Sequence, residues 1–264
     1  MTSQDPVLYA ADGGVATVTL NRPDAMNSLD IATKEALRDA VEEAARDEAV
    51  RCVVLTGRGR AFCVGQDLKE HVQLLERESG ELFRTVPEHY NPLLTTVATM
   101  PKPVVAAVNG VAAGAGASLA FACDFRVLAD TAAFNLAFTG IALSCDTGTS
   151  WSLPRLVGRA KALELLYFPR TISAEEAAQL GLVTTVVPAA DLETEVSALA
   201  RRLADGPTVA FGAIRRSLAF SAGHDLESSL VFEAEMMATT GATRDHREAV
   251  AAFMAKQKPT FEGR

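Results

Sequence analysis

The sequence predicts an α/β protein, with a mixed core of strands and helices followed by a tail that is almost entirely helical. Short β-branched apolar runs, such as residues 104–108, end in turn residues and lead into helical stretches. This order of strand, strand and helix recurs through residues 1–190 without repeated sequence. From residue 191 the pattern is amphipathic helix, so we predict a core of 1–190 and a helical region of 191–264, broken at Gly206-Pro207, Gly223 and Gly241.

The first part of the core contains two strands on either side of a capped helix. Val15–Leu20 alternates apolar residues with threonine, which is typical of a strand. Val53–Thr56 is a continuous apolar run, which predicts a buried strand. Between them, Asp30 has the position of an N-cap for a helix over Ile31–Arg46, whose apolar residues recur at helical spacing.

A second helix is predicted to begin at about Leu68, because Asp67 and Glu70 have the spacing of a capping box. Gln66 then lies where the end of a strand turns into a helix N-terminus, and its backbone N–H is a free donor. The capping role is the simplest interpretation of Asp67. Helical pattern follows over residues 72–99, with interruptions predicted near Gly80, at Pro87 and at Pro92.

The stretch 101–124 is the centre of the predicted site. A buried strand over Val104–Val108 ends at Asn109-Gly110, and small residues then lead into a helix over Leu119–Cys123. A helix start built from small residues leaves backbone N–H groups that a ligand can approach closely. Such donors hold a phosphate, a carboxylate or a developing oxyanion. The alternative is that the small residues only allow close packing of helix and strand.

The rest of the core continues the same order of elements. Strands are predicted over Phe125–Ala129 and Ala132–Leu136, and residues 144–149 form a loop that enters a helix near Ser150. A further helix covers Arg159–Tyr167. The last elements are a helix capped by Ser173 with Glu176 as its box partner, and a strand that ends at Val187.

Composition argues against several partners and locations. The formal net charge of −8 over 264 residues disfavours a nucleic-acid or anionic-membrane surface. The uncharged stretch between Lys102 and Asp124 is too rich in alanine and glycine to favour bilayer insertion. The N-terminus has no basic-then-apolar signal segment, so we expect a cytoplasmic location. We also expect free thiols and no metal site, because neither a CxxC pair nor a metal spacing occurs among Cys52, Cys63, Cys123 and Cys145.

Several groups of residues, in this order and at these spacings, resemble the crotonase (enoyl-CoA hydratase/isomerase) superfamily over nearly the whole chain. They are Asn21-Arg22-Pro23 with Asn27, Ala61-Phe62-Cys63 with Gly65 and Asp67, Pro103 with Asn109-Gly110, Ser173-Ala174 with Gly181-Leu182-Val183, and Ala252-Phe253 with Lys256. Within the superfamily the likeness is greatest to the ring-epoxide isomerases of the phenylacetate pathway. The stretches that carry it are Gly65–Leu68, Tyr90–Leu93, Ala113–Ala117 and Arg247–Lys256.

The resemblance implies a crotonase-like spiral of ββα repeats, followed by C-terminal helices that trimerise. It therefore implies a homotrimer or a dimer of trimers. It also implies an acyl-CoA substrate, with coenzyme A as part of the substrate and no separate cofactor. Carried over by position, the backbone N–H groups of Gln66 and Ala115 would hold the thioester oxygen. Many relatives have glycine where Ala115 stands, but the change keeps the N–H group.

The resemblance also places residues around the coenzyme A portion of the substrate: Ala25, Met26, Ala61, Asp67, Leu68, Phe253 and Lys256. The first three would line the nucleotide end, and Asp67 and Leu68 follow Gln66 in the matching stretch. Phe253 and Lys256 would come from a neighbouring subunit, where the lysine suits a phosphate.

The resemblance bears on the reaction as well. Hydration in this family uses two glutamates, which by position would fall at Ser118 and Phe138, and neither residue is a general base. A double-bond shift needs one carboxylate, and Asp146 stands where family isomerases and a related dehalogenase keep an aspartate. The apolar residues Phe138, Leu143 and Trp151 would raise the pKa of Asp146 towards a useful value.

Other interpretations stay open. Asp146 also fits a cap for the following helix. Its surroundings depart from the family pattern, which has Ile-Pro before the aspartate and Gly-Gly soon after, in place of Ser144-Cys145 and Gly148-Thr149. A Cys145 nucleophile has no histidine near it in sequence, and His71 and His89 fit solvated or core side chains. The preferred hypothesis is an acyl-CoA isomerase; the alternatives are a hydratase with non-standard residues and a non-catalytic acyl-CoA-binding protein.

Overall fold

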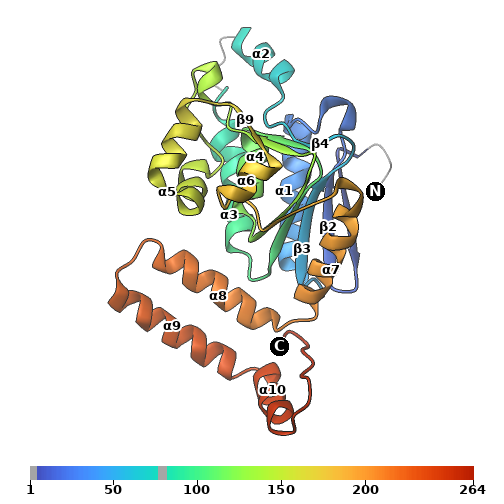
Figure 1. Cartoon of the computed structure of the whole chain (residues 1–264), viewed down its shortest axis with the longest axis vertical. Coiled ribbons are helices and arrows are strands. Elements are labelled where there is room, and N and C mark those ends of the chain that lie inside the picture. The colour runs from blue at the N-terminus through green and yellow to red at the C-terminus, as the bar shows by residue number, and fades with distance from the viewer. Residues whose placement is uncertain (1–4, 77–81) are drawn as a thin grey trace.

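Two β-sheets form the centre of the computed structural model, which describes residues 5–76 and 82–264 (Figure 1). The large sheet has the order β1-β2-β3-β5-β7-β10 and is parallel except for the β1–β2 pair. The small sheet has the order β4-β6-β8-β9 and is parallel except for the β8–β9 pair. Strand bounds in the large sheet are β1 Val7–Asp12, β2 Val15–Leu20, β3 Cys52–Gly57, β5 Val104–Val108, β7 Phe125–Ala129 and β10 Thr185–Val187; in the small sheet they are β4 Ala61–Cys63, β6 Val111–Ala113, β8 Ala133–Asn135 and β9 Thr171–Ser173.

The chain winds between the two sheets. In the successive pairs β3/β4, β5/β6 and β7/β8, the first strand joins the large sheet and the second joins the small one. Each of the first two pairs is followed by a helix, so the repeated unit is strand, strand, helix. The predicted α/β fold class and its spiral of ββα units are confirmed.

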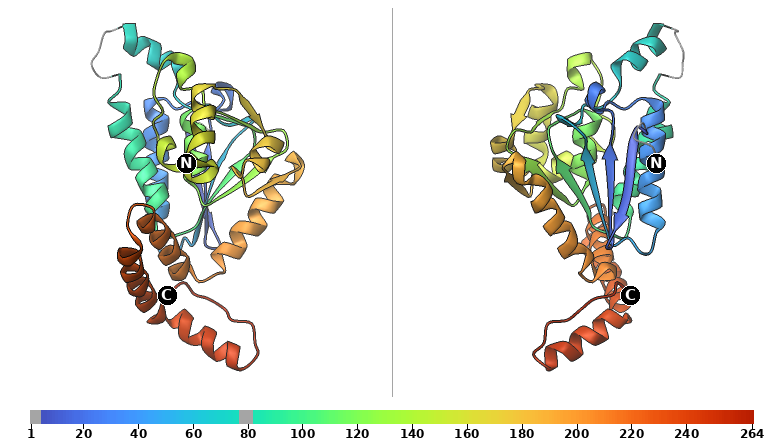
Figure 2. Two further views of the ribbon diagram at one scale, coloured as in Figure 1. Left: turned by 60° about the vertical axis from the view of Figure 1, so that its left-hand side comes forward. Right: turned by 90° about the vertical axis from the view of Figure 1, so that its right-hand side faces the viewer.

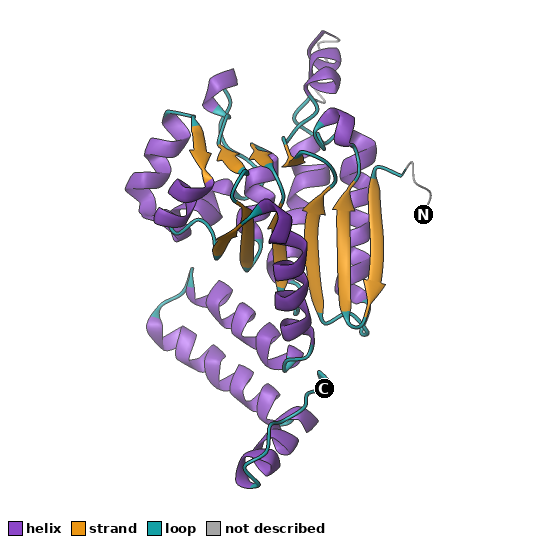
Figure 3. Cartoon of the chain, turned by 45° about the vertical axis from the view of Figure 1, so that its right-hand side comes forward, coloured by secondary structure: helices purple, strands orange, loops and turns teal. Residues whose placement is uncertain are grey.

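Helices cover both faces of the large sheet, as the orange strands between purple helices in Figure 3 show. Helix α1 packs on the β1–β2 side and α7 packs across β3, β5 and β7 on the other face (Figure 2). Helix bounds are α1 Ile31–Arg46, α2 Leu68–Glu76, η2 Val86–Tyr90, α3 Asn91–Thr99, α4 Ala115–Ala122, α5 Thr149–Tyr167, α6 Ala174–Gln179, α7 Leu192–Ala204, α8 Thr208–Ser221, α9 Leu226–Gly241 and α10 Arg244–Met254; short turns are η1 Pro23–Ala25, η3 Thr139–Ile141 and η4 Ala189–Asp191.

The predicted caps are present. The Asp30 side chain accepts a hydrogen bond from Thr33 N at 2.8 Å, and the Ser173 hydroxyl accepts one from Glu176 N at 3.2 Å. Asp67 Oδ1 accepts from Lys69 N at 3.0 Å, so α2 begins where the sequence predicts. Glu70 departs from the capping box, because its carboxylate accepts from Ile31 N at the start of α1 instead.

Three local predictions need correction. Strand β1 was not predicted, because Ala10, Ala11 and Asp12 break the apolar alternation. Residues 111–113 form strand β6 instead of an irregular turn, because β4 and β8 pair with them on both sides. Pro92 does not interrupt the helix. It is the second residue of α3, which continues without a break from the π-helical turn η2, and Pro87 is the second residue of η2. The wider hydrogen bond of this turn, from Asn91 N to Val86 O, lies between the two prolines and carries the helix past them. The break predicted near Gly80 lies outside the described residues.

The C-terminal helices extend away from the sheets (Figure 1). Helix α7 still packs on the large sheet, whereas α8, α9 and α10 form a layer below it. Arg215 on α8 joins this layer to the core, because its guanidinium donates to Asp124 Oδ1 at 2.8 Å and to the carbonyl oxygen of Lys102 at 2.7 Å. By packing, the extension therefore begins with α8, although the composition changes at residue 191.

Candidate active site

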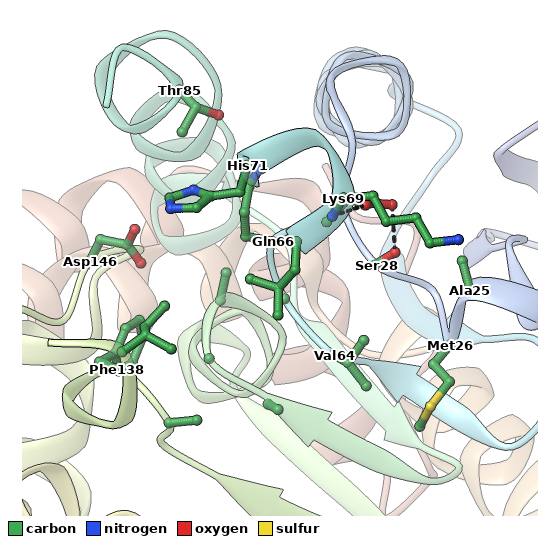
Figure 4. A pocket seen from close by; sticks show the side chains of 18 of the residues that line it. Ala25, Met26, Ser28, Val64, Gln66, Lys69, His71, Thr85, Phe138 and Asp146 are labelled. Carbon is green, nitrogen blue, oxygen red and sulfur yellow. Dashed lines mark hydrogen bonds between the residues drawn. The ribbon is translucent and has the colours of Figure 1, made fainter. Parts of the chain in front are cut away.

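A cavity of about 600 Å³ opens where β2, β4, β6 and β8 end. Its wall is formed by residues from five segments, within 22–28, 60–71, 82–90, 113–115 and 137–146. The carboxyl ends of parallel strands are a common place for ligand sites in α/β folds. In Figure 4, Asp146 and Phe138 lie at one end of the cavity, Ala25 and Met26 lie at the other, and Gln66 is between them.

Two free backbone donors meet in the middle of the cavity wall. Leu29 N donates to Gly65 O at 2.8 Å and Asp67 N donates to Leu29 O at 3.1 Å, so the pairing steps over Gln66. Among the described residues, the Gln66 N–H has no backbone acceptor. Ala115 is the first residue of α4, so no carbonyl of its own helix accepts from its N–H, and no other backbone segment supplies an acceptor for it in the described part of the chain. The structure thus brings both predicted donors to one cavity.

Gly65 brings the two donors close together. A Cβ atom built on Gly65 would lie 3.2 Å from Ala115 N and 2.9 Å from Ala113 O. The backbone of the β4–α2 turn therefore packs directly on the start of α4. Gly65 also has a φ of +85°, which a residue with a side chain rarely adopts. Both the space and the conformation require glycine here.

The small residues of α4 also allow close packing. A Cβ on Gly116 would lie 2.1 Å from Cys63 O, so only glycine lets α4 approach β4 this closely. Gly114 has φ +50° and ψ −122°, a conformation open only to glycine, and no atom would obstruct its Cβ. Both interpretations of this stretch therefore hold: small residues pack the helix, and they leave its N-terminus open to the cavity. The positive end of the α4 dipole lies at the same point.

Asp146 is half-buried in the loop between η3 and α5 and lines the cavity. Its carboxylate makes no capping bond to α5, whose N-cap is Gly148, and accepts instead from the Thr147 hydroxyl at 2.8 Å. Burial raises the pKa of Asp146, against the opposing effects of the Thr147 hydroxyl and the Lys34 charge. Thr147 has a φ of +52°, an uncommon conformation for a β-branched residue.

The raised pKa of Asp146 leads to a stability prediction. The folded protein holds this proton more tightly than the unfolded chain does, so the ionised carboxylate at neutral pH opposes folding. We expect Asp146→Asn to raise Tm at neutral pH, and the gain to vanish as the pH falls through the folded and then the unfolded pKa. Thermal unfolding between about pH 3 and pH 8 measures it. A wild-type Tm equal to that of the variant at neutral pH would contradict the prediction.

The two positions implied for hydration glutamates carry no carboxylate. Ser118 is fully buried, and its hydroxyl lies between the carbonyl oxygen of Gly114, at 3.0 Å, and the hydroxyl of Thr149. Thr149 in turn donates to Asp146 O at 2.7 Å, so this pair of hydroxyls links the start of α4 to the Asp146 loop. Phe138 lines the cavity with its ring.

Only some of the residues predicted near coenzyme A line the cavity. Ala25, Met26 and Leu68 line the cavity, but Ala61 is buried in β4 and its carbonyl oxygen accepts from the Asn27 side chain at 2.8 Å. Asp67 lines the cavity while it holds the wall together: Ser28 Oγ donates to it at 2.9 Å and Arg22 Nη1 at 3.1 Å. Burial would raise the pKa of Asp67, but these bonds together lower it.

Phe253 and Lys256 do not join this cavity within one chain. Both are exposed at the end of α10, in the extension, whereas the cavity lies in the core (Figure 1). Lys256 follows the C-cap Ala255 of α10 and has a φ of +57°.

Three groups near the cavity had no role predicted from the sequence. The Tyr90 hydroxyl donates to Gln66 Oε1 at 2.6 Å, and Lys34 Nζ donates to the same oxygen at 3.1 Å. Lys34 falls at the helical spacing of the buried residues Leu37 and Val41. A lysine on the apolar face of a predicted helix could have indicated a buried charge with a specific role. His71 lines the cavity, with its ring 6.5 Å from that of Phe83.

Three observations concern the thiols, possible metal ligands and helix lengths of the described residues. All four cysteines are free thiols, and burial raises the pKa of Cys52, Cys63 and Cys123 to about 12. The described residues contain no group of histidines, cysteines and carboxylates spaced to hold a metal ion. Across residues 5–76 and 82–264, no helix has both the length and the apolar character that crossing a bilayer requires.

Comparison with known proteins places this geometry in context. The family model for enoyl-CoA hydratase/isomerase matches residues 10–264. A Rhodobacter capsulatus protein named "Probable enoyl-CoA hydratase" is 44% identical over 262 residues, 99% of this chain and 100% of the relative. The 1,2-epoxyphenylacetyl-CoA isomerase of Escherichia coli is 39% identical over 258 residues, 98% of each chain.

Solved structures agree in fold along the whole length. An enoyl-CoA hydratase/isomerase family structure from Mycobacterium abscessus has a TM-score of 0.94 and 43% identity, and covers 98% of this chain and 100% of its own. An enoyl-CoA hydratase from Bacillus anthracis has a TM-score of 0.92 and 34% identity, with the same coverage.

Proposed function

Because the chain belongs to the enoyl-CoA hydratase/isomerase family, we propose that it is an acyl-CoA isomerase that works through an enolate. The observation that carries the proposal is one carboxylate, Asp146, on the same cavity as the free N–H groups of Gln66 and Ala115. The positions of the hydration glutamates hold Ser118 and Phe138. The site therefore has the groups for moving a proton and lacks the usual groups for adding water.

In the proposed reaction the thioester oxygen binds between the Gln66 and Ala115 N–H groups. Asp146 removes a proton from the α carbon of a 3-enoyl-CoA, and the electron pair moves into the thioester to give an enolate. The two N–H groups stabilise the charge on the enolate oxygen, and each such donor typically contributes about 3 kcal/mol. Protonated Asp146 then returns the proton at the γ carbon, which leaves a 2-enoyl-CoA and restores the carboxylate.

The raised pKa of Asp146 suits both steps. A carboxylate of ordinary pKa is a weak base for a carbon acid, and burial makes Asp146 a better one. Two other carboxylates line the cavity. Asp24 lies in η1 beside Ala25, at the end of the cavity opposite to Asp146. Asp67 is held by Ser28 and Arg22, and its pKa is lowered. We therefore assign proton transfer to Asp146 alone.

Coenzyme A would extend from this centre towards Ala25 and Met26, at the other end of the cavity, and Leu68 also lines the cavity. Phe253 and Lys256 would reach it only from a neighbouring subunit, since they lie on the extension of their own chain. Exposed apolar side chains on the extension support assembly through this region, as a trimer or a dimer of trimers: Ile214, Leu218, Leu230, Val231, Met237, Val250 and Met254.

The test is NMR of a 3-enoyl-CoA incubated with the protein in deuterated water. We expect the double bond to move to the 2-position, with deuterium in the product to the extent that protonated Asp146 exchanges with solvent before it returns the proton. Deuterium uptake without a shift would indicate a working oxyanion site with the wrong acyl group. Binding without either change would overturn the isomerase and favour the acyl-CoA-binding protein.

Hydration is the second candidate, and the name of the Rhodobacter capsulatus relative favours it. A second NMR sample with a 2-enoyl-CoA distinguishes the two, because water adds across the conjugated double bond of that substrate to give a 3-hydroxyacyl-CoA, whereas isomerisation adds no water. The E. coli relative supports a narrower proposal, a ring-epoxide isomerase of the phenylacetate pathway. Incubation with 1,2-epoxyphenylacetyl-CoA tests it, and an unchanged substrate spectrum would exclude it.

A further inference from the structure

A buried lysine lies behind the wall of the cavity. The Lys34 side chain is only 1% exposed, because it lies on the face of α1 that carries the buried core residues. Removing a charged ammonium group from water is expensive, so a buried lysine normally has well-placed partners. Lys34 has three: Thr85 Oγ1 at 2.7 Å, Gln66 Oε1 at 3.1 Å and Glu70 Oε2 at 3.5 Å.

These partners come from separate segments that meet at the cavity. Gln66 belongs to the turn before α2, Thr85 precedes η2, and both line the cavity. The Tyr90 hydroxyl donates to the same Gln66 oxygen at 2.6 Å, and Lys34 Nζ lies 5.4 Å from the centre of the Tyr90 ring. One ammonium group therefore joins α1, the β4–α2 turn and η2.

The contact with Gln66 bears on the oxyanion site. The Gln66 side-chain oxygen is held by two donors, while the side-chain nitrogen contacts Glu70 Oε2 at 3.3 Å. Because the side chain is fixed at both of its polar atoms, the residue has little freedom to rotate. The backbone N–H of the same residue is the proposed donor to the thioester oxygen, and such a donor works only if its position is fixed in advance.

The charge of Lys34 also reaches Asp146. Burial raises the pKa of this carboxyl group, and the positive charge of Lys34 opposes part of that rise. Figure 4 shows Thr85, a direct partner of Lys34, on the same side of the cavity as Asp146.

We propose that Lys34 is a positioning residue of the site: its ammonium group fixes the turn that presents the Gln66 N–H and supplies a positive charge that acts on Asp146. The proposal rests on the proposed function for its effect on turnover. The carbonyl frequency of a bound thioester depends only on the oxyanion site of that proposal and not on isomerisation.

The ionisable groups around Lys34 define what a pH profile would report. Of the elements that pack on α1, β2 and α3 contain no ionisable side chain. Tyr9 of β1 lies near Glu43 and Asp47, at the other end of α1 from Lys34. Burial lowers the pKa of Lys34, and three carboxylates oppose this. The groups that act on Lys34 or share its partners are Asp30, Asp67, Glu70, His89, Tyr90 and Asp146.

The direct test compares Lys34→Met with wild type by isotope-edited infrared spectroscopy of bound butyryl-CoA labelled at the thioester carbonyl. In wild type we expect a lower carbonyl frequency than in water, because two N–H groups polarise the bond. In Lys34→Met we expect most of this lowering to disappear. We also expect kcat to fall by about 10-fold to 100-fold with little change in KM, as small misplacements of catalytic groups produce.

The dependence of kcat on pH is a second test, because a variant that only loosened the structure would not change the pKa of Asp146. Without the Lys34 charge the pKa of Asp146 rises, so the acid limb of kcat against pH should move to higher pH. Lys102→Met is the matched control, since Lys102 is also a buried lysine but donates to the carbonyl oxygens of Ala44 and Asp47 at the far end of α1. It should keep the wild-type carbonyl frequency and acid limb.

A further variant covers the case in which Lys34→Met does not fold. Gln66→Met keeps the backbone N–H but removes the amide that Lys34 and Tyr90 hold, so it should lose the carbonyl shift without moving the acid limb. A wild-type carbonyl frequency in Lys34→Met or in Gln66→Met would overturn the proposal, as would equal effects of Lys34→Met and Lys102→Met. Absence of a carbonyl shift in wild type would instead contradict the proposed oxyanion site.

Discussion

Replacing Asp146 by asparagine is expected to lower turnover of a 3-enoyl-CoA by about 10³-fold and to leave acyl-CoA affinity nearly unchanged. The amide has the size of the carboxyl group and still accepts a hydrogen bond from the Thr147 hydroxyl. It cannot accept a proton from carbon or return one. The substrate oxygen and the coenzyme portion bind elsewhere in the cavity, so Kd should not follow kcat. Stopped assays of kcat and equilibrium titration with butyryl-CoA measure the two quantities.

A matched control is Asp130→Asn, because Asp130 also accepts a hydrogen bond, from Ala189 N at 3.0 Å, but lies outside the cavity. It should retain wild-type turnover. Wild-type turnover in Asp146→Asn would exclude Asp146 as the proton carrier. Loss of butyryl-CoA binding in the same variant would show that the carboxylate has a structural role in the cavity.

The sequence predicted the elements that depend on local rules. Asp30 and Ser173 cap their helices because an N-cap bond involves only the next few residues. Strand β6 was missed because three small residues have no strand pattern of their own, and β4 and β8 hold them in place. In the same way Ala115 was identified as a backbone donor, but its closeness to Gly65 depends on the packing of two turns that are far apart in the sequence.

In the site, too, the residues were predictable from the sequence, whereas the contacts between distant segments were not. The resemblance identified Gln66, Ala115 and Asp146, and the structure puts all three on one cavity. It identified no partner for Gln66, because the Lys34 contact joins residues 32 positions apart and the Tyr90 contact joins residues 24 positions apart. A lysine at a core position of α1 signals a buried partner, but the sequence does not say which one. Phe253 and Lys256 were predicted beside coenzyme A, but they are exposed on the extension, and under the proposed function only a neighbouring chain would bring them to the cavity.

Gly65→Ala is expected to lower kcat by about 10²-fold to 10³-fold, the range seen when one oxyanion donor is lost. The new Cβ would lie 2.9 Å from Ala113 O and 3.2 Å from Ala115 N, and both of these are backbone atoms that cannot rotate away. The β4–α2 turn must therefore move off the start of α4, which separates the Gln66 and Ala115 N–H groups. The carbonyl frequency of bound butyryl-CoA should return towards its value in water.

Gly223→Ala controls for the change of glycine to alanine, because no atom lies within 4 Å of a Cβ there and the residue is between α8 and α9. It should keep wild-type kcat and carbonyl frequency. If Gly65→Ala also kept both, the oxyanion donors could not be the N–H groups of residues 66 and 115.

Loss of stability cannot imitate this result. Alanine at a φ of +85° adds strain of about 1–2 kcal/mol, and the contact with Ala113 O adds to it. A typical domain has about 5–15 kcal/mol of stability, so the variant remains almost entirely folded well below its Tm. Unfolding would reduce the concentration of active sites and would leave the carbonyl frequency of the remaining bound ligand unchanged. A fall in kcat together with a changed carbonyl frequency therefore reports the relative position of the two N–H groups.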